Sequence, residues 1–209
     1  MRSRPTASQS SRSDLDGPRR SVLEYSGLVQ HLGISPELLD EHRSWLAPEQ
    51  FTLLIQGLWL ALDAEYLGFG NAPSKPVSFA MMCHASIHCR NLEKALQRGL
   101  LFYSLFPEAP RLTLSRDDEW VRLSLYDSQL WDPDHFLSES LLVIWHRLGS
   151  WLIGQRIRLE QATFSYAKPA HGAEYDLLFP CPLVFSADRS SLLFHSRYLS
   201  MPLLQDERT

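Results

Sequence analysis

The residues best suited to chemistry lie in one short segment, from Cys83 to Cys89. His84 and His88 are four residues apart, so on a helix their imidazoles lie one turn apart, as helical zinc ligands do. The general-base glutamate of an HExxH site is missing, because Ser86 stands near its place, and no third ligand is identifiable nearby. Cys83 and Cys89 are about 600° apart around a helix, so the thiols do not face the way the histidines do. We therefore expect a packed, partly polar helix face and no metal site.

No other motif in the sequence supports catalysis. A Gly-x-Ser-x-Gly nucleophile elbow is missing, since Ser26 precedes Gly27 without the first glycine. The acidic residues 117–119 fall in an expected hairpin turn, where solvation makes them ordinary surface charges. Gly68 and Gly70 lack a preceding strand and a third glycine, so neither phosphate-binding loop is supported. We expect a protein that is not an enzyme and holds no cofactor.

Binding is better supported than catalysis. Aromatic side chains recur on the apolar faces of several expected helices, where they could line a pocket between helices and sheet or simply form the core. Polar groups within those faces are the ones that would orient a ligand. The six residues that we predict to bind a ligand are Trp59, Phe79, His84, His88, Tyr103 and His146.

Helices dominate the first half of the expected domain. Apolar residues at helical spacing, with start and stop signals, predict helices over 21–33, from 35 onward, and over 48–68, 79–89 and 91–105. Asn91 is the expected N-cap of the last of these.

The second half mixes strands with one long helix. Alternating apolar residues between Leu112 and Leu125 predict a β-hairpin that turns at 116–119. The longest helix is expected from Asp132, its N-cap, to Gly154. Its apolar stripe, which should cover the hairpin, is Leu137, Leu141, Ile144, Trp145, Leu148 and Trp151.

Three further strands complete the expected sheet. A strand over 157–164 changes phase near Gln161, which suggests a bulge. Two brief strands over 183–185 and 192–194 are joined by the turn residues 187–190. The predicted fold class is α+β: an N-terminal helical half packed on a mixed, mainly antiparallel sheet of about five strands, with the long helix covering it.

Composition indicates an ordinary globular domain that stays in the cytoplasm. The 209 residues are 44% hydrophobic and 21% charged, without an apolar run long enough for a membrane helix or a secretory signal. Residues 1–20, with five arginines and five serines, are expected to be a disordered tail. Those arginines outnumber Asp14 and Asp16 by three, so the net charge of −4 leaves −7 on the rest of the chain. We therefore expect residues 21–205 to form one acidic domain that binds nucleic acid poorly.

Two stretches of the sequence carry a family pattern of apolar, proline and glycine positions. The first runs from Leu53 to Phe106 and includes Asp63, Leu67-Gly68, Pro76, Phe79, Asn91-Leu92-Glu93-Lys94-Ala95-Leu96 and Tyr103. The second includes Phe164, Lys168-Pro169, Tyr175, Phe179-Pro180-Cys181-Pro182, Leu183-Val184-Phe185, Ser191-Leu192-Leu193-Phe194 and Tyr198-Leu199-Ser200-Met201-Pro202-Leu203. Over residues 21 to about 205 the chain resembles the N-terminal effector domain of AraC-type transcriptional regulators, in the subgroup called arabinose-binding-like.

The resemblance implies a sensor that binds a small-molecule effector and often assists self-association as a homodimer. It also implies control of a C-terminal pair of helix-turn-helix motifs that binds promoter DNA. This chain departs from the family pattern because it stops at Thr209, where the linker to that DNA-binding domain would begin. We expect residues 206–209 to start the linker and the chain to be a piece of a longer protein. DNA binding is then assigned only to the C-terminal domain outside this chain.

Two alternatives remain open at this stage. The first is a protein–protein interaction module that dimerises through its apolar helix faces and binds no ligand. The second is a metal-dependent enzyme that uses His84 and His88, although the residues present name no reaction class.

Overall fold

The computed structural model describes residues 56–57, 63, 65–66, 75–106, 109–127, 132, 134–169, 172 and 175–206. Several expectations lie outside these residues: the disordered tail at 1–20, the helices over 21–33 and from 35 onward, most of the helix over 48–68, Trp59, and the linker residues 207–209.

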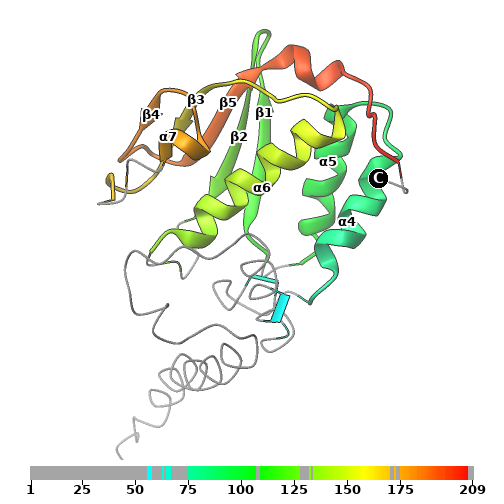
Figure 1. Ribbon diagram of the computed structural model, residues 1–209, viewed down its shortest axis with the longest axis horizontal. Helices are drawn as coiled ribbons and strands as arrows, with labels where there is room; N and C mark the ends of the chain where they lie inside the picture. Colours follow the sequence, from blue (N-terminus) through cyan, green and yellow to red (C-terminus); the bar gives the residue numbers. More distant parts are fainter. Residues whose placement is uncertain are drawn as a thin grey trace, which may run out of the picture.

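A mixed sheet of five strands forms the centre of the described fold (Figure 1). The strands are β1 (Arg111–Arg116), β2 (Trp120–Tyr126), β3 (Leu159–Thr163), β4 (Leu183–Val184) and β5 (Ser190–His195). Their order across the sheet is β1-β2-β5-β3-β4, and every neighbouring pair is antiparallel except β3 and β4. The predicted α+β class with a mixed, mainly antiparallel sheet is confirmed.

The first hairpin forms where the alternating pattern predicts it. β1 and β2 pair in register from Arg111 opposite Tyr126 to Arg116 opposite Val121. The carboxylate of Asp117 accepts hydrogen bonds from the backbone N–H of Glu119 at 3.1 Å and of Trp120 at 2.7 Å, which holds the turn. The apolar residues of β2 that alternate along the strand are fully or almost fully buried: Val121, Leu123 and Leu125.

The last strands do not pair as the sequence pattern predicts. The expected hairpin between 183–185 and 192–194 is wrong, because β4 runs parallel to β3 and β5 lies between β2 and β3. Ser186 has a left-handed φ of 55°, which turns the chain away after β4. In the observed position β5 pairs along both of its edges and buries Leu192 and Phe194, whereas a hairpin with the two-residue β4 would leave most of it unpaired. The predicted irregularity near Gln161 is confirmed, since the β3–β5 register shifts between Leu159 and Gln161.

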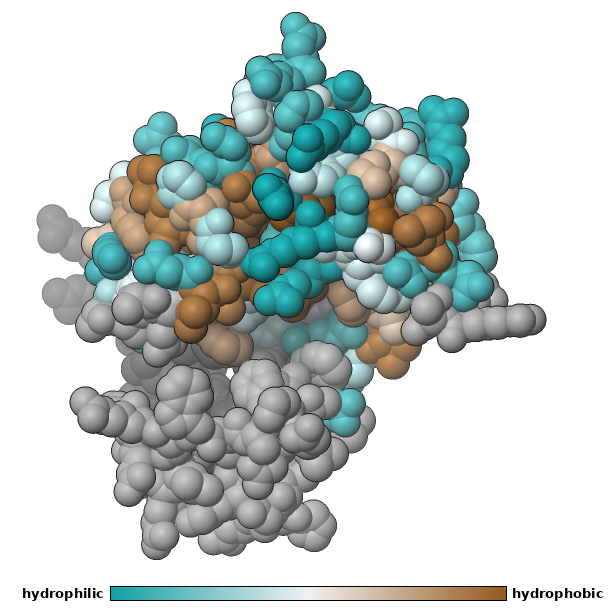
Figure 2. Space-filling view, turned by 45° about the horizontal axis from the view of Figure 1, so that its top comes forward, coloured by the Kyte–Doolittle hydropathy of each residue, from teal (hydrophilic) through white to brown (hydrophobic). Residues whose placement is uncertain are grey.

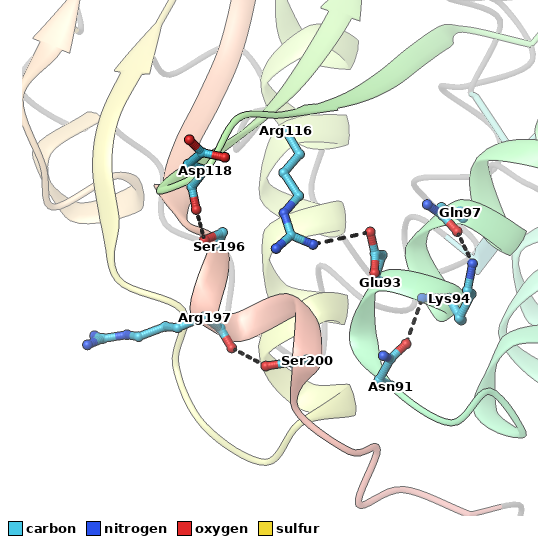
Figure 3. Close-up of polar contacts among 9 residues, drawn as sticks. All are labelled: Asn91, Glu93, Lys94, Gln97, Arg116, Asp118, Ser196, Arg197 and Ser200. Atoms are coloured by element: carbon cyan, nitrogen blue, oxygen red, sulfur yellow. Dashed lines mark hydrogen bonds and ion pairs between the residues drawn. The ribbon is translucent and has the colours of Figure 1, made fainter.

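Side-chain caps and ties fix the helices that precede the sheet. α4 (Ser78–Ile87) is followed by α5 (Leu92–Tyr103), and the side chain of Asn91 accepts from the backbone N–H of Lys94 at 3.1 Å, as predicted for an N-cap. Glu93 in the first turn of α5 meets Arg116 of β1 at 3.6 Å (Figure 3). At the turn of the same hairpin, the hydroxyl of Ser196 donates to the carbonyl of Asp118 at 3.1 Å and holds the 3-10 helix η1 (Ser196–Ser200) against the turn (Figure 3).

The long helix α6 (Phe136–Leu152) lies across the sheet, with α5 beside it and α4 further out (Figure 1). The carboxylate of Asp132 accepts from the backbone N–H groups of Leu137 at 3.0 Å and Ser138 at 2.8 Å. The predicted N-cap position is wrong, because His135, in a left-handed conformation, is the N-cap and the helix begins at Phe136. The carboxylate of Asp132 nevertheless accepts from N–H groups of the first turn that have no partner within the helix. α5 and α6 approach closely, because a Cβ added to Gly99 would lie 2.8 Å from the ring of Trp145.

A short helix and a shared core complete the described fold. α7 (Tyr175–Leu178) lies beside β3 and β4 (Figure 1). The buried core joins all these elements and includes Met82, Leu92, Leu142, Leu152, Phe164, Tyr175, Phe179 and Leu192. Within the described part of the chain, none of the helices has the length and hydropathy that crossing a lipid bilayer requires.

Candidate functional site

A cavity of about 890 Å³ is the candidate functional site. Its walls come from α4, α5, β1, α6 and α7 and from Glu65 and Tyr66, which precede α4. A volume of this size is typical of pockets that enclose small organic ligands.

The α6 wall of the cavity is an apolar stripe that the core does not cover. Phe136, Ser140, Ile144, Arg147 and Trp151 recur at helical spacing and all line the cavity. Phe136, Ile144 and Trp151 are 40%, 41% and 40% exposed, although they are large and apolar. On the face shown in Figure 2, apolar side chains (brown) reach the surface in several groups between hydrophilic ones (teal). Exposed apolar area of this kind is typical of surfaces that bind something.

The wall formed by α4, α5 and the residues before α4 carries polar groups that stay protonated or already have hydrogen-bond partners. The carboxylate of Glu65 accepts from the backbone N–H of Phe79 at 3.1 and 3.2 Å, and partial burial raises its pKa above the ordinary value. Burial, helped by the nearby Glu65, raises the pKa of the Cys83 thiol to about 11. The pKa of Tyr103 is also raised, chiefly by burial. At neutral pH both Cys83 and Tyr103 are therefore uncharged, and neither is an activated nucleophile.

A second carboxylate on the wall, that of Glu139, is held by two tyrosines. Both Tyr166, at 3.2 Å, and Tyr175 donate their hydroxyls to the same carboxylate oxygen. The ring of His135 stacks on Tyr166 with the ring centroids 3.7 Å apart. Burial raises the pKa of both tyrosines, so they remain donors at neutral pH. Like Glu65, Glu139 is already hydrogen-bonded inside the protein.

The six predicted ligand-binding residues are distributed over different parts of the molecule. Phe79 on α4 and Tyr103 on α5 both line the cavity. His84 and His88 are exposed on α4 and at its C-terminal end, and they do not line it. Among the described residues, no three His, Cys, Asp or Glu side chains are grouped closely enough to hold a metal ion.

The other two predicted residues have different positions. His146 is buried on the side of α6 away from the exposed stripe, and its Nε2 donates to the carbonyl of Ile157 at 2.8 Å. Burial lowers the pKa of His146, and the positive charges of Arg156 and Arg147 add to this effect, while the hydrogen bond to Ile157 opposes it. Trp59 lies outside the described residues.

The sequence prediction missed most of the cavity wall that α6 provides. It assigned Ile144 and Trp151 to the core stripe, whereas both are about two-fifths exposed at the cavity. A signal was present, because Leu142, Leu152 and Phe136 make α6 apolar on more than one side. A helix that is apolar on more than one side can pack one side against the core and present another to a second apolar partner.

Comparison with known proteins places the chain in a family. It is 26% identical over 172 residues to the ornithine utilization regulator of Pseudomonas aeruginosa, a match that covers 81% of this chain and 51% of the relative. The chain thus spans about half the length of the curated relative it matches. The crystal structure of the transcriptional regulator CdpR from Pseudomonas aeruginosa superposes with a TM-score of 0.46 at 14% identity, over 88% of this chain and 57% of that one.

The family model described as the arabinose-binding domain of AraC transcription regulator, N-terminal, matches residues 23–203. Its members and the curated relative are regulators of transcription and not enzymes. The resemblance inferred from the sequence is confirmed: the chain belongs to the AraC family of transcription regulators through this N-terminal domain.

Proposed function

We propose that residues 23–203 are the sensing half of a cytoplasmic transcription regulator. A small-molecule effector binds in the cavity between α6 and the α4–α5 pair, and Phe79 and Tyr103 contact it. The bound state then alters how a C-terminal helix-turn-helix domain of the full-length protein binds promoter DNA. The observation that carries this proposal is the cavity itself, together with the large apolar side chains of α6 that remain about 40% exposed on its wall.

Contacts at the end of α6 provide a route from the cavity to the end of the domain. The side chain of Gln205 donates to the carbonyl of Trp151 at 2.7 Å, and the backbone N–H of Leu204 donates to the carbonyl of Leu152 at 2.8 Å. Trp151 also lines the cavity. A ligand that shifts the last turn of α6 therefore acts directly on residues 204–205. Such a ligand changes the domain only as far as it binds one arrangement better than the other.

A thermal-shift screen of metabolites against the 209-residue chain tests the proposal. A compound present at 100 times its dissociation constant adds about 2.7 kcal/mol, or about 5–10 °C in melting temperature for a domain of this size. Ser140→Phe places a large ring in the cavity and should remove that shift, whereas Gln97→Phe at an exposed position of α5 should keep it. A screen without any stabilising compound, or a hit that Ser140→Phe leaves unaffected, contradicts the proposal.

Self-association is a second candidate function, which could accompany sensing or replace it. Val77, which precedes α4, and Met81 in its first turn are 61% and 58% exposed, and Leu101 in the last turn of α5 and Leu105, which follows it, are 65% and 70% exposed. Large apolar side chains that remain exposed in this way are typical of surfaces that associate. Sedimentation of the chain should reveal a dimer that Leu101→Glu weakens. A monomer at all accessible concentrations would exclude this role for the chain.

A further inference from the structure

The charged side chains on the cavity wall differ in whether they already have hydrogen-bond partners. The carboxylate of Glu65 accepts from the backbone at the start of α4, and the carboxylate of Glu139 accepts from two tyrosine hydroxyls. Among the described residues that line the cavity, Arg147 is the remaining charged one. Within the described part of the chain, no hydrogen bond or ion pair engages its guanidinium.

Arg147 lies at the centre of the exposed apolar stripe of α6. Ile144 is three residues before it and Trp151 four residues after it, so both are its neighbours on the helix surface. Both also line the cavity and are about 40% exposed. A cation with five N–H donors thus projects from an otherwise apolar patch, a geometry that suits a carboxylate or a related planar anion.

We propose that the effector is an amphipathic organic anion, with an apolar body that fills the cavity and an anionic group that pairs with Arg147. This inference rests on the proposed sensing function and specifies the chemical class of its ligand. The body covers the exposed parts of Phe136, Ile144 and Trp151, and the anion pairs with a guanidinium that has no hydrogen-bond or ion-pair partner among the described residues.

The apolar lining of the cavity disfavours a small, strongly hydrophilic effector. A sugar or a free amino acid needs several hydrogen-bonding groups that converge on it. Here the carboxylates of Glu65 and Glu139 already have partners, and most of the remaining lining side chains are apolar, including Leu112, Val143 and Leu148. The volume of about 890 Å³ would also leave most of the cavity unfilled by a molecule of that size.

Four probes with related alkyl chains test the class of ligand: decanoate, octanoate, 1-decanol and decylamine. Each is titrated into the 209-residue protein, and binding is followed by calorimetry or tryptophan fluorescence. Decanoate should bind most tightly. Octanoate should bind roughly ten-fold or more weakly, since each buried methylene is worth a factor of about four. The alcohol and the amine have the same apolar chain but no anion, so they should bind at least about ten-fold more weakly than decanoate.

Substitution of the arginine separates the charge from the apolar contacts. Arg147→Gln should weaken decanoate about ten-fold and leave 1-decanol unchanged, so that the two bind alike. Arg90→Gln, at an exposed arginine that does not line the cavity, is the matched control and should change neither affinity. Ser140→Phe should abolish binding of decanoate, which locates the site.

The outcomes distinguish this inference from the function on which it rests. Equal binding of decanoate and 1-decanol by the unsubstituted chain overturns the anionic class while leaving an apolar sensor intact. Preferential binding of decylamine would also overturn it. If none of the four probes binds, the inference fails, and the metabolite screen with Ser140→Phe decides separately whether the cavity senses anything.

Discussion

Two apolar regions meet α6, and they are packed in opposite ways. At its N-terminal end, an aromatic cluster of Phe164, Tyr166, Tyr175, Phe179 and Phe185 has neighbouring ring centroids as close as 4.9 Å, and Phe164, Tyr175 and Phe179 are at most 1% exposed. Along its outer face, Phe136, Ile144 and Trp151 remain about 40% exposed around the cavity. Hydroxyl groups of the aromatic cluster have hydrogen-bond partners, whereas the guanidinium of Arg147 has none among the described residues.

This difference indicates that the aromatic cluster contributes mainly to stability and the cavity wall mainly to ligand binding. A side chain that is fully surrounded contributes its whole burial to the folded state, and its removal leaves a cavity. A side chain on an open wall has much of its apolar surface still in water, so the protein gains from covering it only when a ligand arrives. Substitutions in the aromatic cluster should therefore lower the free energy of unfolding, and substitutions on the cavity wall should mainly change ligand affinity.

The largest effect is expected from Phe164→Ala. Phe164 is fully buried and contacts four other aromatic rings, so its loss should lower the free energy of unfolding by about 3–5 kcal/mol. Urea denaturation followed by fluorescence measures it, with Leu178→Ala, at a partly exposed position of the cavity wall, as the comparison. A similar loss in both variants would show that the two regions are not packed as differently as their exposure indicates.

A smaller loss is expected from Tyr175→Phe, which removes one hydroxyl from the aromatic cluster and keeps the ring. The carboxylate of Glu139 then loses one of its two tyrosine donors, at a cost of about 1.5–3 kcal/mol. Tyr126→Phe is the control, because its hydroxyl contacts Arg189 at the protein surface. Equal unfolding midpoints for Tyr175→Phe and the unsubstituted chain would mean that this hydrogen bond adds nothing to stability.

His146 gives the packed side of α6 a dependence on pH. Burial lowers its pKa in the folded state, so between that value and about 6.5 the unfolded chain binds more protons than the folded one. The free energy of unfolding should therefore fall as the pH drops from 7.5 to 5.5, by at most about 1.4 kcal/mol per pH unit. His146→Gln, which keeps a donor for Ile157, should reduce this slope, and His84→Gln at an exposed site should not. Identical slopes in all three proteins would contradict the assignment.

The smallest effect on stability is expected on the cavity wall. Ile144→Ala removes a side chain that is 41% exposed and improves helix propensity slightly, so the free energy of unfolding should change by no more than about 0.5 kcal/mol. The affinity for decanoate, or for any compound found in the screen, should nevertheless fall several-fold. Loss of stability without loss of affinity would assign Ile144 to the core, as the sequence pattern first suggested.

The sequence by itself determined the elements and many of their ends. The first hairpin and the Asn91 cap follow from short-range patterns, because they depend on hydrogen bonds between residues a few positions apart. The change of apolar phase near Gln161 also predicted the irregularity of β3, although its partner strand β5 is distant in the chain. The family pattern of apolar, proline and glycine positions likewise identified the domain, and the match to residues 23–203 confirms it. Phe79 and Tyr103 were placed on apolar helix faces for the same reason and do line the cavity.

Only the tertiary structure decided how those elements meet. β5 lies between β2 and β3, and β4 pairs in parallel with β3, because the number of ladder bonds and the burial of Leu192 and Phe194 depend on partners far away in the chain. The sides of α6 were also ambiguous, since a helix that is apolar on more than one side does not indicate which side the core will cover. Packing against Ile157 and the sheet buries His146 and Leu142 and leaves Ile144, Arg147 and Trp151 at the cavity.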